Sequence, residues 1–179
     1  MLQMVNLECV CGHTHLVVAG RHIMSVECCC TSCRTASRHF ERLPGGRPIL
    51  TGYGATSYVL YRKDRVRVVS GREKLKAYKL STETPTQRVV ATCCNTPVFL
   101  NFKPGHWLSI YGALWPDGAR PPLEMRAMTK DMERGVVLPN DVPNAQTYPL
   151  SFFLRLFGAF VAMGFRKPVI DIAEEVLAG

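Results

Sequence analysis

Short apolar stretches separated by polar or turn-forming residues dominate the chain as far as Trp115. In several of them apolar and polar side chains alternate, which is typical of strands with one buried and one wet face. Val66 and Val68, for example, are interleaved with Arg65 and Arg67. We predict a mainly β fold, with strands over residues 15–19, 23–28, 57–61, 65–69, 74–80, 88–92, 98–102 and 107–114.

The connections between these stretches contain turn-forming residues. The polar segment 62–64 (RKD) lies between the predicted strands 57–61 and 65–69, and this arrangement predicts a β-hairpin. Glycines and prolines mark residues 43–48 as a loop, and residues 139–149 form a second irregular stretch.

The C-terminal part of the chain has a different pattern. Residues 150–165 are apolar apart from interruptions such as Ser151 and Arg155, and they predict a buried helix or a contact between copies of the chain in a homo-oligomer. A membrane-spanning helix needs about 20 apolar residues, so we expect no membrane span, with attachment to a membrane surface as the alternative. Pro168 can begin a last helix over residues 169–177.

Length and charge limit the classes of protein to consider. We predict a zinc-binding β domain over residues 1–138 and a loop and helical extension over residues 139–179 packed on it. The net charge of +8 favours anionic partners. The basic residues are scattered, however, and the densest group, between Arg62 and Lys79, follows predicted strands. We expect a solvated strand face there, with nucleic-acid binding as the less favoured alternative.

Cys28, Cys30 and Cys33 form a C-x-C-x-x-C motif that can hold a metal ion. Three thiolates this close together suit a soft or borderline metal such as zinc. Zinc usually takes four ligands, so three protein ligands leave one position for water or substrate. The motif therefore predicts an open, catalytic-type zinc site. Cys29 is expected to point away from its neighbours and to be a buried spectator.

The surroundings of the eight cysteines favour metal ligands over disulfides. The first residues, MLQMVNLECV, show no basic start followed by an apolar run, so we expect a cytoplasmic protein. In a reducing compartment clustered cysteines are more often metal ligands or redox groups than disulfides. Redox or disulfide chemistry is the alternative. The isolated His22, His39 and His106 are expected to be surface or packing residues.

The motifs occur in a recognisable order. C-x-C-G at residues 9–12 is followed by C-x-C-x-x-C-R at residues 28–34, then by a cysteine-containing turn and by Tyr-Gly-Ala-Leu at residues 111–114. This order resembles the family of glutathione-dependent formaldehyde-activating enzymes (GFA), which includes the centromere protein V domain. The resemblance covers about residues 7–115 and implies a β-tent fold of small antiparallel sheets with zinc sites.

By the same resemblance, Cys9 and Cys11 would join a downstream cysteine pair around a structural zinc, and the C-x-C-x-x-C motif would hold the catalytic zinc. The family's downstream motif is C-x-x-C-G. Here Ala91 stands at the first cysteine, Cys94 matches the second, and Asn95 takes the place of the glycine. Asn is among the few residues that tolerate a left-handed φ, which favours this alignment.

The fourth ligand of that structural site is left open by the sequence. Cys93 is one alternative, although adjacent residues in an extended chain point in opposite directions. His13, His15 or water are the others. A further departure is Trp115, which stands where the family commonly has an Asp.

The reaction attributed to the family joins glutathione and formaldehyde into S-hydroxymethylglutathione. The resemblance therefore implies a zinc-dependent protein of the carbon–sulfur lyase class that acts on the adduct of an aldehyde with glutathione or another thiol. The rival hypothesis is a non-catalytic zinc-binding module whose basic face binds nucleic acid or protein. No P-loop, dinucleotide-binding or serine-hydrolase motif is present in the sequence.

Overall fold

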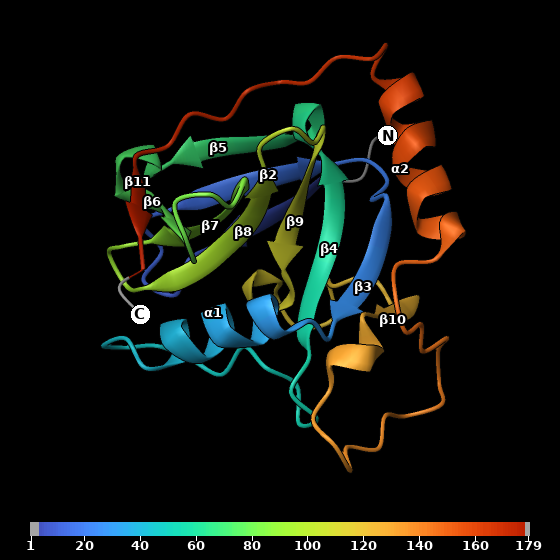
Figure 1. The fold of residues 1–179 in the computed structure, drawn as a ribbon. Coiled ribbons are helices and arrows are strands. Elements are labelled where there is room, and N and C mark those ends of the chain that lie inside the picture. Colours follow the sequence, from blue (N-terminus) through green and yellow to red (C-terminus); the bar gives the residue numbers. More distant parts are fainter. Residues whose placement is uncertain (1–3, 178–179) are drawn as a thin grey trace.

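Strands pair into two sheets in the computed structural model, which describes residues 4–177 (Figure 1). The smaller sheet is antiparallel, in the order β1 (Met4–Glu8), β2 (His15–Ala19) and β5 (Val66–Ser70). The larger sheet has eight strands among the described residues, in the order β10 (Met125–Ala127), β3 (Met24–Cys28), β4 (Thr56–Arg62), β9 (Trp107–Tyr111), β8 (Thr96–Phe102), β7 (Thr86–Ala91), β6 (Leu75–Lys79) and β11 (Glu174–Val176). With the helices α1 (Thr31–Glu41) and α2 (Leu150–Ala162), the fold is mainly β, as predicted.

The inner strand β4 is buried on both faces of the larger sheet. Val59 and Tyr61 belong to an apolar cluster with residues of the smaller sheet, whereas Tyr58 and Leu60 belong to a second cluster that includes Phe40 of α1. Successive side chains of a strand point to opposite faces, so one strand supplies two apolar clusters. This alternation places Tyr58 on the same side of the sheet as α1, where the cysteine motif lies.

The predicted strands are present, although the one over residues 107–114 ends at Tyr111, before a 3₁₀ turn over Gly112–Leu114. The predicted hairpin is wrong. Residues Lys63–Arg65 form a 3₁₀ turn, after which β5 pairs with β2 in the smaller sheet. Both edges of β4 are already hydrogen-bonded, to β3 and to β9, so no edge is free for β5. The polar turn therefore connects two sheets, although its length would suit a hairpin.

Helix α1 begins directly at the cysteine motif and was not predicted. Its first turn is capped by Cys30, whose Sγ accepts a hydrogen bond from the backbone N–H of Cys33 at 3.4 Å. Cys33, Ala36 and Phe40 are buried at the three- and four-residue spacing of a helix. That spacing is present in the sequence and was the available signal for this helix.

Helix α2 forms where an apolar helix was predicted, but the expectation that it is buried within the chain is wrong. Phe152 and Leu156 are buried, whereas Phe153, Leu154 and Phe157 are 53%, 60% and 59% exposed. The helix lies along one side of the molecule, beside β3 of the larger sheet (Figure 1). A contact between copies of the chain through this face stays a prediction. No helix within residues 4–177 is long and apolar enough to cross a membrane.

The helix predicted over residues 169–177 is also wrong. The chain is extended there and forms β11, which pairs in parallel with β6. Glu175 of β11 forms an ion pair with Lys76 of β6, and Glu174 forms one with Lys103, which directly follows β8. A free sheet edge presents unpaired backbone donors and acceptors, and β11 covers such an edge. Backbone pairing with a distant strand thus overrides the local helical pattern.

The irregular segment before α2 is held to the sheet by Arg126 of β10. This side chain is 2% exposed and bonds to Glu27 of β3 at 2.9 Å and to Asp141 at 2.7 Å. It also donates to the backbone oxygen of Pro139 at 3.1 Å. A buried cation needs such partners, because desolvation of an unpaired charge is costly. The anchor fixes the segment whose end, Tyr148, reaches the cysteine motif.

Two candidate metal centres

The first group of possible metal ligands combines Cys9 and Cys11, from the turn between β1 and β2, with Cys93 and Cys94, from the turn between β7 and β8. The Sγ atom of Cys9 lies 3.6 Å from that of Cys11 and 3.7 Å from that of Cys93. Cys93 and Cys94 have their sulfurs 3.9 Å apart. A tetrahedral zinc with Zn–S distances of about 2.3 Å separates its sulfurs by roughly 3.8 Å. The four thiols are therefore positioned to bind one metal ion, and their spacing is compatible with zinc.

A tight turn explains how the adjacent Cys93 and Cys94 reach the same point. Residues 92–95 form a turn after β7, and Asn95 has the left-handed φ of 53°. The objection that neighbouring residues point apart applies only to an extended chain, and this segment is not extended. Ala91, the residue matched to the family's first cysteine, is fully buried at the end of β7. The structure thus brings Cys93 to the position left open by the sequence.

The nearby histidines lie around this group. Nδ1 of His13 lies 3.1 Å from Sγ of Cys11, so the imidazole can hydrogen-bond to that sulfur. His15 is turned to the backbone oxygen of Gly12, at 2.5 Å from its Nε2. Four sulfurs already complete a tetrahedron, so neither histidine is needed as a ligand.

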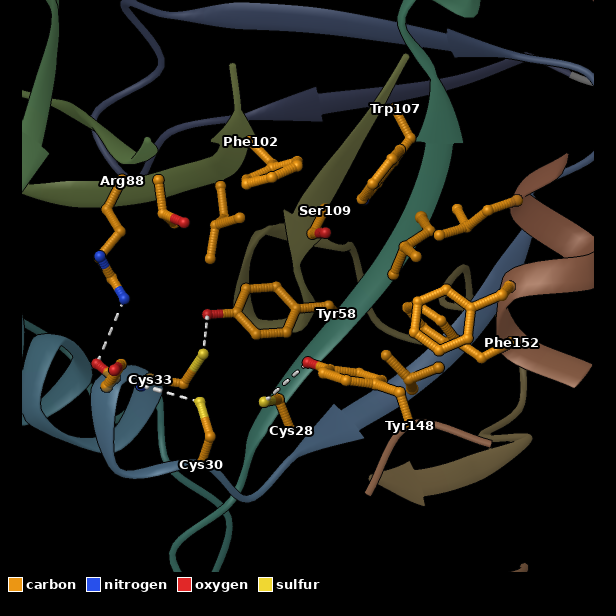
Figure 2. Close-up of a pocket in the computed structure, with 17 residues that line it drawn as sticks. Cys28, Cys30, Cys33, Tyr58, Arg88, Phe102, Trp107, Ser109, Tyr148 and Phe152 are labelled. Atoms are coloured by element: carbon orange, nitrogen blue, oxygen red, sulfur yellow. Dashed lines mark hydrogen bonds between the residues drawn. The ribbon is translucent and has the colours of Figure 1, made fainter. Parts of the chain in front are cut away.

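The second group consists of Cys28, Cys30 and Cys33, whose sulfurs all lie within 4.8 Å of one another. Cys28 ends β3, Cys30 caps α1 and Cys33 lies in its first turn, so a strand-to-helix junction gathers them (Figure 2). Cys28 and Cys33 are buried, and Cys30 is partly exposed. Among the described residues no other His, Cys, Asp or Glu joins this group. A metal held here would keep a position for a ligand from outside the chain.

Two tyrosine hydroxyls contact this second group, and sequence reasoning missed both. The hydroxyl of Tyr58 donates to Sγ of Cys33 at 3.5 Å, and that of Tyr148 lies 3.4 Å from Sγ of Cys28. Burial raises the pKa of both phenols well above the usual value, so both stay protonated. Partners of this kind orient metal ligands and tune the metal. No local signal marks these tyrosines, because Tyr148 is 120 residues from Cys28.

Hydrogen bonds among the three sulfurs shift the pKa values of their thiols in opposite directions. The thiol of Cys28 hydrogen-bonds to the sulfur of Cys30 and lowers the pKa of Cys30 to about 3. The same contact raises the pKa of Cys28 to about 11, and the pKa of Cys33 is raised as well. Three thiolates at this spacing repel one another, so a divalent cation among them is the way to ionise all three.

A pocket of about 560 Å³ opens beside the second group. All three cysteines line it, together with Tyr58, Tyr148 and Arg88, and most of its remaining wall is apolar or aromatic. Figure 2 shows the sulfur atoms at the lower part of this pocket, with Phe102 and Trp107 above them. Its size is in the range of small-molecule sites, roughly 300–1,000 Å³.

Other residues weighed in the sequence lie away from this pocket. Cys29 is fully buried outside both cysteine groups, as a spectator should be. Trp115 is stacked on Tyr61 and lines a different cavity, beside Arg21 and Arg120. Arg67 of β5, one of the basic residues between Arg62 and Lys79, is exposed.

Comparisons with known proteins leave the family open. No family model matches the chain, and no curated protein matches it. Among solved structures, the crystal structure of a Rhodobacter sphaeroides protein from a structural genomics programme is similar, with a TM-score of 0.47 and 17% sequence identity. That match covers 78% of this chain and 99% of the other.

We expect protein purified without chelators to carry two zinc ions per chain, one for each cysteine group. Elemental analysis measures this directly. Cys30→Ser should reduce the count to one, while Cys29→Ser, which changes the spectator between the ligands, should leave it at two. Stoichiometric iron with cluster absorbance, or folded protein without metal, would contradict the zinc assignment.

Proposed function

We propose that this protein is a divergent relative of the GFA enzymes, with one closed zinc site and one open zinc site, and that it makes or cleaves the adduct of a thiol with an aldehyde. The observation that carries the proposal is the difference between the two cysteine groups. Four sulfurs at tetrahedral spacing form the first, whereas the second has three and lines a pocket. A three-ligand site beside a pocket is the arrangement expected of catalytic zinc.

The residues around the open site fit this chemistry. When bound to the three sulfurs, zinc would stabilise an incoming thiol as the thiolate and polarise a carbonyl oxygen. In the forward direction a sulfur–carbon bond forms, and the proton lost by the thiol ends on the former carbonyl oxygen. The hydroxyls of Tyr148, next to Cys28, and of Tyr58, next to Cys33, both line the pocket and are candidate donors to that oxygen. The apolar pocket walls offer few hydrogen-bond partners to water, so a substrate that fills the pocket would displace water from the reacting atoms.

The test is the rate of S-hydroxymethylglutathione formation from glutathione and formaldehyde, followed by NMR exchange with zinc-loaded protein. We expect a rate above that of the spontaneous reaction. Cys30→Ser should return it to the spontaneous rate, whereas Cys29→Ser should retain it. If fully zinc-loaded protein gives no acceleration with glutathione or with a more apolar thiol, the non-catalytic zinc module becomes the better hypothesis.

A further inference from the structure

The walls of the pocket beside Cys28, Cys30 and Cys33 are mostly apolar. Apart from the cysteines and a few hydroxyl groups, the described lining is almost entirely apolar and aromatic, including Leu100, Phe102, Trp107, Phe152 and Leu156. No Asp, Glu or Lys contributes to it. Glutathione carries one ammonium and two carboxylate groups, and burying an ammonium without a partner is costly. The pocket therefore favours a ligand that is largely apolar.

One charged side chain does line this pocket. Arg88 of β7 is 2% exposed, and its Nη2 donates to the backbone oxygen of Ser32 at a long 3.4 Å. Its Nε and Nη1 atoms have no hydrogen-bond partner among the described residues, and it takes part in none of their ion pairs. Arg126, the other deeply buried arginine on the large sheet, is paired with Glu27 and Asp141.

This contrast suggests that the partner of Arg88 is a ligand. A buried guanidinium without an anion loses its hydration and gains little in return. In Figure 2, Arg88 and Phe152 lie on opposite sides of the view, with Tyr58 and the cysteine sulfurs between them. A ligand with its anionic group at Arg88 and its apolar body toward Phe152 of α2 would cross the cysteine group.

We propose that the pocket binds amphiphilic carboxylates: a single carboxylate paired with Arg88, and an apolar body against the aromatic wall. If the proposed function holds, on which this step rests, the substrate is an apolar thiol or aldehyde that bears one carboxylate. An N–H group of Arg88 that lacks a partner, on Nη1 or on Nε, donates a hydrogen bond to a carboxylate oxygen. The apolar body displaces water from Phe102, Trp107 and Leu156.

A competing role for Arg88 is to balance the negative charge of three thiolates around a zinc ion. Arg88 is close enough to favour the thiolate form of Cys30. The two roles predict different consequences of removing the guanidinium. Charge balance predicts weaker zinc binding, with carboxylate binding unchanged once zinc is saturating. Ligand recognition predicts loss of carboxylate affinity in fully zinc-loaded protein.

The experiment is calorimetric titration of the zinc-loaded full-length chain with decanoate, decanol, decylamine and glutathione. We expect decanoate to bind most tightly. Arg88→Gln should weaken decanoate binding by about 10- to 100-fold, because it removes hydrogen bonds to a charged group, and should change decanol binding by less than about twofold. Arg67→Gln, a matched change on the exposed side of β5, should change neither.

Two outcomes overturn the proposal: equal affinity for decanoate and decanol in the wild-type protein, or undiminished decanoate binding by zinc-saturated Arg88→Gln. The wild-type ligand series decides the matter even if Arg88→Gln does not fold. Phe102→Ala should weaken the binding of both decanoate and decanol.

Because carboxylate binding is measured without a thiol, it is independent of whether a thiol enters the metal site. Decanoate binding without catalysis would retain this proposal and remove the proposed function.

Discussion

Replacing Cys93 or Cys94 with Ser is expected to destabilise the protein severely, lowering its melting temperature by on the order of 10 °C or more. A metal bound by these residues with Cys9 and Cys11 ties together turns that are 84 positions apart, counted from Cys9 to Cys93. Binding at structural zinc sites contributes about 10–16 kcal/mol in zinc-finger peptides, which is comparable to the entire stability of a typical domain. Losing one ligand therefore removes a large share of the folding free energy.

Cys30→Ser is the matched comparison, and we expect it to cost much less stability. Cys28, Cys30 and Cys33 lie within one short segment, so a metal there closes only a small loop and restricts the unfolded chain little. Thermal melts of Cys93→Ser, Cys94→Ser and Cys30→Ser, each with its zinc content measured, test the ranking. If Cys30→Ser lowers the melting temperature most, the three-sulfur group would be the structural site and the four-sulfur group the catalytic one, the reverse of our assignment.

Cys93→Ser also tests how the fourth ligand is supplied. By alignment with the GFA motif, the first downstream cysteine falls at Ala91, which has no sulfur, and the fourth ligand stays open between Cys93, a histidine and water. By geometry, the sulfur of Cys93 lies 3.7 Å from that of Cys9 and completes the group. We expect Cys93→Ser to lose zinc from this site as fully as Cys94→Ser does. Retention of two zinc ions by Cys93→Ser would show that His13 or water takes its place.

Cobalt in place of zinc should make the open site visible. When a small thiol is added, we expect the ligand-field and thiolate-to-metal charge-transfer bands to shift, because a fourth sulfur enters the coordination of the Cys28–Cys30–Cys33 group. Cys33→Ser should abolish the shift entirely while leaving the absorbance of the other cobalt site. Absorption spectroscopy with glutathione and with a mercaptocarboxylate of long apolar chain measures both.

The control for this experiment is Cys29→Ser, which alters a buried cysteine next to the ligands without removing one. Its bands should shift as in the wild type. A spectrum that stays unchanged at saturating thiol would show a closed site. That result would remove the thiol mechanism and leave a zinc-binding module, whatever the carboxylate titrations show.

Much of the secondary structure was predictable because strands carry a local signal. The alternation around Val66 and Val68 identified β5, and the apolar run after residue 150 identified α2. Their surroundings were not predictable in the same way. Whether β5 pairs with β4 or with β2 depends on which strand edges are free. Whether α2 is buried all round depends on whether another part of the chain packs on the face that carries Phe153 and Phe157.

The candidate sites likewise differ in how much of each could be predicted from the sequence. The sequence by itself determined the three-sulfur group, because residues 28–33 can reach one metal ion through local geometry alone. Only the tertiary structure decided that Cys93 joins Cys9 and that Tyr58, Arg88 and Tyr148 line the pocket beside the three-sulfur group. Those contacts depend on the order of strands in the larger sheet and on the anchoring of the segment before α2. Pairings between distant segments are selected by the packing of the whole chain, so they cannot be predicted from the local pattern of side chains.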